Sequence, residues 1–99
     1  MFIVLLAYVK PINLVDSHLS AHREFLQRNY ETGAFLLSGP KEPRTGGVIL
    51  VNLDSHEELQ AILAEDPFHR FEVAEYTIIR LTATMTAPSL QWLLPTDTY

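Results

Sequence analysis

The sequence contains no cysteine among its 99 residues. Disulfides, thiolate nucleophiles and cysteine-based zinc sites are therefore excluded. Basic residues are also few, because seven lysines and arginines stand against twelve aspartates and glutamates and leave a net charge of −5. The seven are scattered, so no basic cluster is present to neutralise a nucleic-acid backbone or an anionic membrane surface. We therefore expect neither nucleic acid nor a membrane as a partner.

Long apolar segments and glycine-rich cofactor motifs are missing as well. The apolar run 2–9 is too short to cross a membrane and lacks the basic start of a signal peptide. A small domain without cysteine fits a reducing compartment, so we expect the protein in the cytoplasm. The sequence has no GxGxxG or P-loop pattern, and its motifs therefore predict no cofactor.

The length and the hydrophobic pattern predict one α+β domain, residues 1–82, followed by a tail, residues 83–99. Apolar runs predict four strands, and apolar residues spaced three and four apart predict two amphipathic helices. The strands are 2–9, 34–38, 48–53 and one within 71–81; the helices run from Asp16 or Ser17 to Tyr30 and from Ser55 to about Asp66. This β-α-β-β-α-β order is the ferredoxin-like arrangement, with a four-stranded antiparallel sheet.

Local signals support these boundaries. Gly33 stands where a left-handed residue ends the first helix, and Ser55 with Glu58 fits a capping box. The glycines and prolines between residues 38 and 48 predict a hairpin of the second and third strands.

The first and third strands are apolar at nearly every position, which predicts that both faces of the sheet are covered. Two helices cover only one face, so the other face would be a large exposed apolar patch. A second copy of the sheet is the simplest cover, and we expect a homodimer or a larger homo-oligomer. The tail contains an apolar patch, residues 90–94, which we expect to pack, with a partner subunit as one option.

His22 and Asp66 are the candidate catalytic residues. His22 lies on the apolar stripe of the first helix, between Leu19 and Leu26, so it is either a core histidine satisfied by a carbonyl or a functional group. Asp66 precedes Pro67 after the second helix, a position that also suits a plain turn. Both helices share one sheet face, so a pair is feasible. A carboxylate bonded to one imidazole nitrogen orients the ring, and the other nitrogen is free to move a proton.

Other candidate residues have equally plain structural explanations. Ser38, Gly39 and Pro40 end the second strand as a simple turn, or Ser38 donates a hydrogen bond into a pocket. Tyr8 lines the same pocket or merely packs. His18 and His22 have a metal-ligand spacing, but the intervening glutamate of metalloproteases is missing, so we predict no metal site.

Three short segments together resemble a known family. Residues 21–26 (AHREFL), 33–40 (GAFLLSGP) and 65–68 (EDPF) resemble the YciI-like proteins, small domains of the dimeric α+β barrel type. The resemblance covers most of residues 1–82. It implies a paired His22 and Asp66 as the active centre and a pocket near Ser38, Gly39 and Pro40. One branch is linked to dehydrochlorination of a chlorinated hydroxyquinol. Related barrels include muconolactone isomerases and monooxygenases, and some bind haem or flavin without a short motif.

These features predict a cofactor-independent enzyme for a small metabolite, aromatic or carbonyl-containing. His22 would transfer a proton in an isomerisation or an elimination, and Asp66 would orient it. The alternatives are a non-catalytic dimer that binds or senses a small molecule, and an assembly role that uses the tail.

Overall fold

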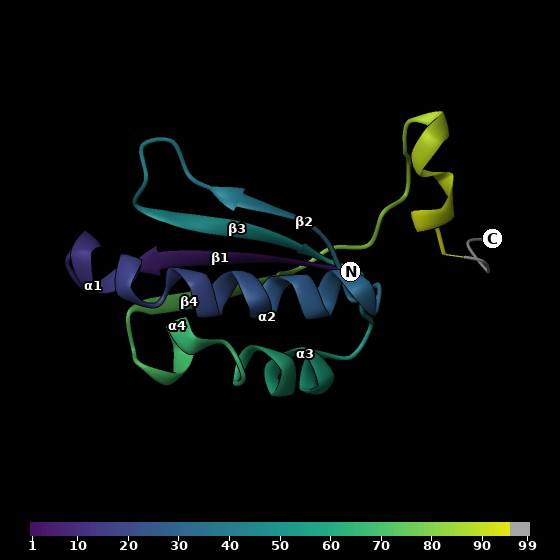
Figure 1. The fold of residues 1–99 in the computed structure, drawn as a ribbon. Helices are drawn as coiled ribbons and strands as arrows, with labels where there is room; N and C mark the ends of the chain where they lie inside the picture. Colours follow the sequence, from purple (N-terminus) through teal and green to yellow (C-terminus); the bar gives the residue numbers. More distant parts are fainter. Residues whose placement is uncertain (96–99) are drawn as a thin grey trace.

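The computed structural model describes residues 1–95, which form an antiparallel sheet with helices on one face (Figure 1). The strands are β1 (Phe2–Tyr8), β2 (Phe35–Pro40), β3 (Gly46–Val51) and β4 (Ala74–Arg80). Their order in the four-stranded sheet is β2-β3-β1-β4, and each neighbouring pair is antiparallel. The predicted ferredoxin-like α+β fold is confirmed. The last four residues of the predicted tail, 96–99, lie outside the described residues.

The helices are α1 (Ile12–Ser17), α2 (Leu19–Glu31), α3 (His56–Leu63) and α4 (Pro67–Arg70), and a 3-10 helix, η1 (Pro88–Leu93), follows the domain. Figure 1 shows α2, α3 and α4 together on one side of the sheet. None of the helices in residues 1–95 combines the length and hydrophobicity that a membrane span needs.

The core lies between the sheet and these helices. Phe2, Val4 and Leu6 alternate along β1 toward the helices and are buried, as the period of two in a strand requires. Phe25 of α2 and Leu59 of α3 meet them and are fully buried. Each such side chain contributes about 1.5–3 kcal/mol of hydrophobic stabilisation, so this layer fixes where α2 and α3 lie on the sheet.

The predicted start of the first helix was wrong. Helix α1 already begins at Ile12, after Pro11, and buries Val15; the chain then breaks at His18 before α2 begins. Neither Asp16 nor Ser17 caps α2: Asp16 binds Arg44 across the domain, and the Ser17 hydroxyl donates to the carbonyl of Leu14. The sequence pattern missed α1 because a six-residue helix is too short to show a periodic stripe.

The predicted cap signals at the other helix ends are correct. Gly33 has φ of +81° just after α2, the left-handed conformation that glycine adopts without strain. The Ser55 hydroxyl accepts a hydrogen bond from the backbone N–H of Glu58 at the start of α3. Helix α4 was not predicted, and the fourth strand, Ala74–Arg80, lies within the predicted range 71–81.

The second face of the sheet is apolar and carries no helix. Ile3 pairs with Leu50 on one side and Ile79 on the other, and Leu5 pairs with Val48, so these side chains share the open face. Leu37 extends the same face on β2 and is 56% exposed. The apolar second face expected from the strand sequences is therefore present.

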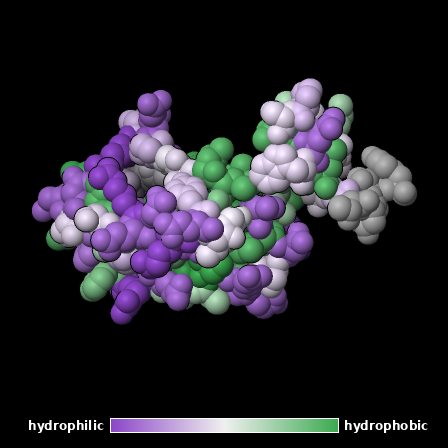
Figure 2. Space-filling view, turned by 45° about the vertical axis from the view of Figure 1, so that its right-hand side comes forward, coloured by the Kyte–Doolittle hydropathy of each residue, from purple (hydrophilic) through white to green (hydrophobic). Residues whose placement is uncertain are grey.

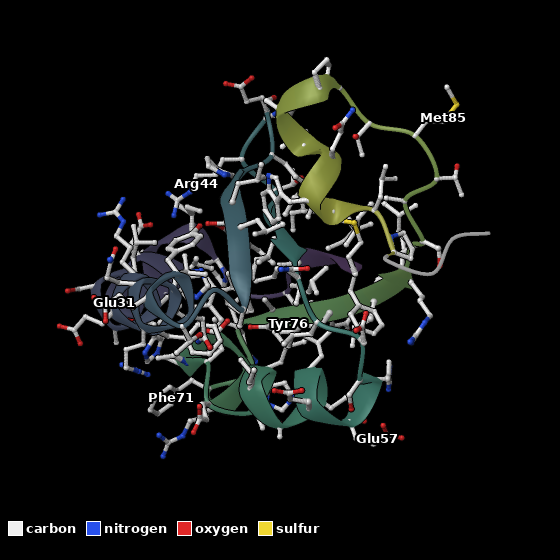
Figure 3. The ribbon with its side chains drawn as sticks, turned by 90° about the vertical axis from the view of Figure 1, so that its right-hand side faces the viewer. Glu31, Arg44, Glu57, Phe71, Tyr76 and Met85 are labelled. Atoms are coloured by element: carbon white, nitrogen blue, oxygen red, sulfur yellow. The ribbon has the colours of Figure 1, made fainter. Side chains whose placement is uncertain are left out.

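The described part of the tail leads away from this sheet. Figure 1 shows η1 standing off the body of the domain, and Figure 2 shows apolar surface, in green, beside it. Trp92 of η1 is 61% exposed and Met85 is 89% exposed, and Met85 points away from the domain in Figure 3. Within one copy of residues 1–95, these large apolar side chains stay in contact with solvent.

Candidate active site

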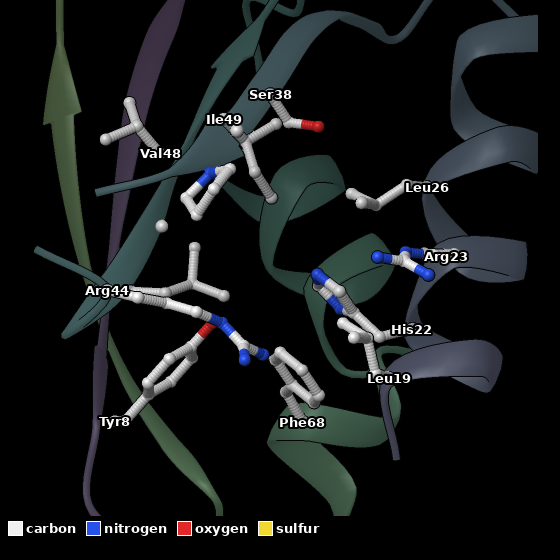
Figure 4. A pocket seen from close by; sticks show the side chains of 14 residues that line it. Tyr8, Leu19, His22, Arg23, Leu26, Ser38, Arg44, Val48, Ile49 and Phe68 are labelled. Atoms are coloured by element: carbon white, nitrogen blue, oxygen red, sulfur yellow. The ribbon is translucent and has the colours of Figure 1, made fainter. Parts of the chain in front are cut away.

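A pocket of about 470 Å³ opens between α2, α4 and the β2–β3 end of the sheet (Figure 4). Five residues singled out from the sequence line it: Tyr8, His22, Ser38, Gly39 and Pro40. The rest of the lining is mainly apolar, and the volume suits a small organic molecule. The sixth candidate, Asp66, is fully buried behind His22 and is not part of the lining.

His22 and Asp66 form a buried hydrogen-bonded pair. The His22 Nδ1 atom lies 2.7 Å from Asp66 Oδ1, although 44 residues separate the two in sequence. Helix α2 presents His22 from its buried face, and Asp66 occupies the N-cap of α4. The histidine is only 8% exposed, and what exposure it keeps is toward the pocket that it lines. The geometry therefore brings the two predicted residues together and leaves only the histidine accessible.

Three donors converge on the Asp66 carboxylate. Oδ1 accepts from His22 and from the backbone N–H of Phe68, at 3.0 Å, and Oδ2 accepts the hydroxyl of Tyr76. Pro67 at the first position of α4 holds Asp66 in the extended conformation that a helix cap needs. A buried carboxylate is tolerated when such bonds replace its lost hydration. Asp66 is thus locked in place from three elements.

Phe68 fixes the plane of the His22 ring. The two rings stack with centroids 3.9 Å apart and an angle of 3° between their planes. Phe68 is itself buried and meets Tyr8 edge-on at 6.0 Å. The imidazole is therefore held by stacking on its face and by Asp66 at one edge, which leaves little rotational freedom.

This arrangement assigns different roles to the two nitrogens of His22. An ionised carboxylate only accepts hydrogen bonds, so Nδ1 carries the proton that is donated to Asp66. Within residues 1–95 no group bonds to Nε2, and this atom is not among the fully buried polar atoms. In the neutral ring Nε2 therefore has a free lone pair that is accessible from the pocket, the form required of a general base.

Tyr76 is the member of this network that the sequence did not suggest. It lies on β4 inside the domain, whereas the labelled Glu31 and Glu57 point into solvent (Figure 3). Burial, followed by the charge of Asp66 and the hydrogen bond to it, raises the pKa of Tyr76 well above its ordinary value. The phenol therefore remains a neutral donor to Asp66 across the physiological pH range.

Replacing Tyr76 with phenylalanine should lower the free energy of unfolding by about 1–3 kcal/mol at neutral pH, because one carboxylate oxygen loses its donor. The folded-state pKa of Tyr76 is raised, so its contribution is complete below the unfolded value of about 10 and is lost as the pH rises further. Urea unfolding at several pH values measures both effects. The wild type and Tyr76→Phe should differ most near neutrality and converge above about pH 10; a gap that widens with pH would contradict this.

The end of β2 and Tyr8 occupy the side of the pocket opposite α2. The Ser38 hydroxyl is hydrogen-bonded to the hydroxyl of Tyr30, so it is oriented by α2 as it lines the pocket. Gly39 and Pro40 continue the wall, and Tyr8 lies at the end of β1. The predicted turn at Ser38, Gly39 and Pro40 was wrong, because these residues pair with β3 as the last part of β2, and they form pocket wall.

Two arginines also line the pocket, and neither was singled out from the sequence. Arg23 follows His22 on α2, and Arg44 reaches in from the β2–β3 loop (Figure 4). Arg44 Nη2 lies 2.6 Å from Asp16 Oδ1, and its guanidinium carbon is 5.7 Å from the Tyr8 ring centroid. The hydrogen bond to Asp16 and then the neighbouring Tyr8 raise the already high pKa of Arg44, so it is a permanent cation.

The missed residues had weak or no signals in the sequence. Tyr76 shares the alternation of Ile78 on β4 and so faces the helices, but its hydroxyl partner follows only from the crossing of β4 and α4. Phe68 follows the Asp-Pro cap directly and could have been assigned to the first turn of a short helix. Nothing local distinguishes Arg44 from other polar residues of a hairpin loop.

Comparison with known proteins gives a solved structure with a similar fold and then the family of the chain. A solved structure of 5-chloro-2-hydroxyhydroquinone dehydrochlorinase (TftG) from Burkholderia phenoliruptrix AC1100, in complex with 2,5-dihydroxybenzoquinone, matches with a TM-score of 0.69. The match has 16% sequence identity and covers 83% of this chain and 94% of that one, and it supports the fold. No curated protein matches the chain significantly. The model of the YCII-related domain matches residues 1–82, and the chain belongs to this family. The resemblance to YciI-like proteins is therefore confirmed.

Proposed function

We propose that this protein is a cofactor-independent enzyme that moves a proton on a small aromatic or carbonyl-containing molecule. The observation that carries the proposal is the His22–Asp66 hydrogen bond of 2.7 Å at the base of an open, mainly apolar pocket. A histidine with one nitrogen oriented by a carboxylate and the other accessible is a typical general acid–base. Asp66 is a positioning residue in this proposal, because it acts on the substrate only through His22.

The proposed reaction needs only groups that the pocket supplies. His22 Nε2 accepts a proton from a carbon or hydroxyl of the substrate, and the electron pair of that bond forms a new double bond. In an isomerisation the imidazolium returns the proton to another atom; in an elimination a leaving group departs with its electron pair, so that acid is lost overall. Both reactions balance without an oxidant or a reductant. The carboxylate stabilises the imidazolium while the proton is held.

The name of the structural neighbour suggests the first compounds to test. TftG acts on 5-chloro-2-hydroxyhydroquinone and was solved with 2,5-dihydroxybenzoquinone. Elimination of chloride from a hydroxylated ring belongs to the reaction type proposed here, and a ring of that size suits a pocket of about 470 Å³. The pocket also contains a phenol, Tyr8, and a hydroxyl, Ser38, which suit ring oxygens.

Proton transfer can be measured before the natural substrate is known. We would incubate the protein in heavy water with a panel of cyclic ketones, hydroxyquinones and chlorinated hydroxyquinols. NMR would follow the exchange of carbon-bound hydrogen for deuterium, and an ion-selective electrode would follow chloride. Exchange or chloride release that depends on His22 supports the enzyme. Saturable binding of panel members without either signal would replace it with the non-catalytic binding protein.

We further propose that the protein forms a homodimer through the open face of the sheet. The face contains large apolar side chains from all four strands, and η1 holds Trp92 and Leu90 exposed beside the domain. In a dimer the two sheets cover each other, and the tail segment 83–95 packs on the partner subunit. Apolar surface of this extent is otherwise unusual in a monomer.

Replacing Leu37 with glutamate should convert such a dimer to a monomer. The carboxylate would enter an apolar interface twice because the contact is symmetric, and we expect the dissociation constant to rise by about 100-fold or more. Light scattering after size exclusion measures the mass. Leu14→Glu is the matched control, since Leu14 is also an exposed leucine, at 45%, but lies on α1. An unchanged mass for Leu37→Glu would reject the sheet interface, and an unchanged dimer affinity after deletion of residues 83–99 would reject the role of the tail.

A further inference from the structure

The charges that line the pocket are opposite in sign to the charge of the chain. The protein has a net charge of −5, yet the lining contains Arg23 and Arg44 and no aspartate or glutamate. Two of the seven cationic residues of the chain, 21 positions apart in sequence, therefore meet at one small opening. In Figure 4 their guanidinium groups lie on either side of the His22 ring.

The nearby carboxylates leave much of this positive charge available. Asp66 is enclosed behind His22 and is already bonded by three donors. Asp16 binds Arg44 through a single atom pair, Oδ1 to Nη2, and the side chains of Arg44 and Asp16 are 37% and 47% exposed. A guanidinium has five N–H donors, so the remaining edge of Arg44 can bind a second acceptor. Arg23 makes no side-chain ion pair within residues 1–95.

The apolar side chains of the pocket favour an organic anion over an inorganic one. Leu19, Leu26, Ile49 and Phe68 offer apolar surface, which would not replace the hydration shell of an inorganic ion. An organic anion satisfies both halves of the pocket, because its apolar body packs on these side chains and its charged group meets the guanidinium groups.

We infer that the pocket selects small organic anions, whose carboxylate or phenolate group is bound by Arg23 and Arg44 beside Nε2 of His22. This inference builds on the proposed function and names its substrate class. It also has a chemical consequence. The two cations that hold the anionic group next to the proton acceptor also stabilise the negative charge that develops on the adjacent carbon or oxygen when the proton leaves. Arg23 and Arg44 are therefore specificity-determining residues of the same site.

Calorimetric titration with benzoate and with its neutral analogue benzamide tests the inference. We expect the wild type to bind benzoate at least about tenfold more tightly than benzamide, because a charge-assisted hydrogen bond contributes that much. Arg44→Gln and Arg23→Gln should each weaken benzoate binding by about tenfold or more and leave benzamide unchanged within about twofold. Arg28→Gln is the matched control: Arg28 is an exposed arginine of α2 that does not line the pocket.

Each outcome decides for or against the anion site. Equal affinity for benzoate and benzamide, no binding of benzoate at millimolar concentration, or an equal loss in Arg28→Gln would overturn it. Thermal unfolding of all three variants verifies that the fold is retained. Benzoate binding that depends on Arg23 and Arg44, in a protein that transfers no proton, would keep this inference and reject the proposed enzyme. Turnover that depends on His22 but not on either arginine would reject this inference and keep the proposed enzyme.

Discussion

Replacing His22 with glutamine lowers the kcat of proton transfer by about 100- to 10,000-fold, the usual contribution of a general acid–base. Glutamine has a similar size and can still donate a hydrogen bond to Asp66, but it offers no basic nitrogen to the pocket. We expect KM to change much less than kcat, because His22 is one of many lining groups. The measurement is the rate of deuterium exchange or chloride release on the substrate that the panel identifies.

His56→Gln is the control for this experiment. His56 is an exposed histidine at the start of α3, outside the pocket, so its replacement should leave the rate unchanged. Matching thermal unfolding curves for the two variants would separate a chemical loss from a structural one. A His22→Gln protein that is folded and retains the wild-type rate would be incompatible with the proposed mechanism.

Replacing Asp66 with alanine has the largest expected effect on stability. The substitution removes a fully buried carboxylate and leaves the N–H of Phe68, the hydroxyl of Tyr76 and the imidazole of His22 without their acceptor. Each buried donor left without its acceptor costs about 1–3 kcal/mol, so the loss of this shared acceptor is a large share of the stability of a small domain. Urea unfolding monitored by circular dichroism measures the change in the free energy of unfolding.

Two further variants separate the roles of Asp66. Asp54→Ala removes an exposed aspartate whose side chain makes no ion pair within the described residues, and should change stability by less than about 0.5 kcal/mol. Asp66→Asn keeps the shape but offers an amide donor to Nδ1, which favours the wrong tautomer of His22. We expect this variant to retain more stability than Asp66→Ala and still lose kcat. A full rate in Asp66→Asn would show that Asp66 does not position His22.

The elements that could be predicted from the sequence are those specified by local patterns. Apolar runs located all four strands, and the spacing of apolar residues with the caps located α2 and α3, because burial leaves a pattern that a single segment reveals. The topology then brought α2 and the end of α3 to the same face, which is why His22 and Asp66 could be considered as a pair. Their hydrogen bond depends on packing and was outside the reach of any pattern.

The features that were missed depend on short segments or on distant partners. Helices α1 and α4 have six and four residues, too few for a periodic stripe. Asp16 was interpreted as a cap from its position near the helix start, but the competing partner was Arg44, 28 residues away in sequence. Tyr76 and Arg44 join the site only because β4 crosses α4 and the hairpin loop folds over the pocket. Tertiary contacts of this kind leave no trace in the local sequence.

The loop of the β2–β3 hairpin contributes to ligand binding but not to the proton-transfer network. Gly46 begins β3 directly against β1, where a Cβ atom would lie 1.8 Å from the carbonyl oxygen of Leu6, so the start of this strand requires glycine. The proton-transfer network is built from α2, α4 and β4, and the loop 41–45 between β2 and β3 contributes Arg44 to the opposite wall of the pocket. Exchanging residues 41–45 for other sequences should therefore redirect ligand choice while the chemistry and the folding core stay intact. Substitutions in this one loop are therefore a direct route to proteins that bind different ligands with the same proton-transfer network.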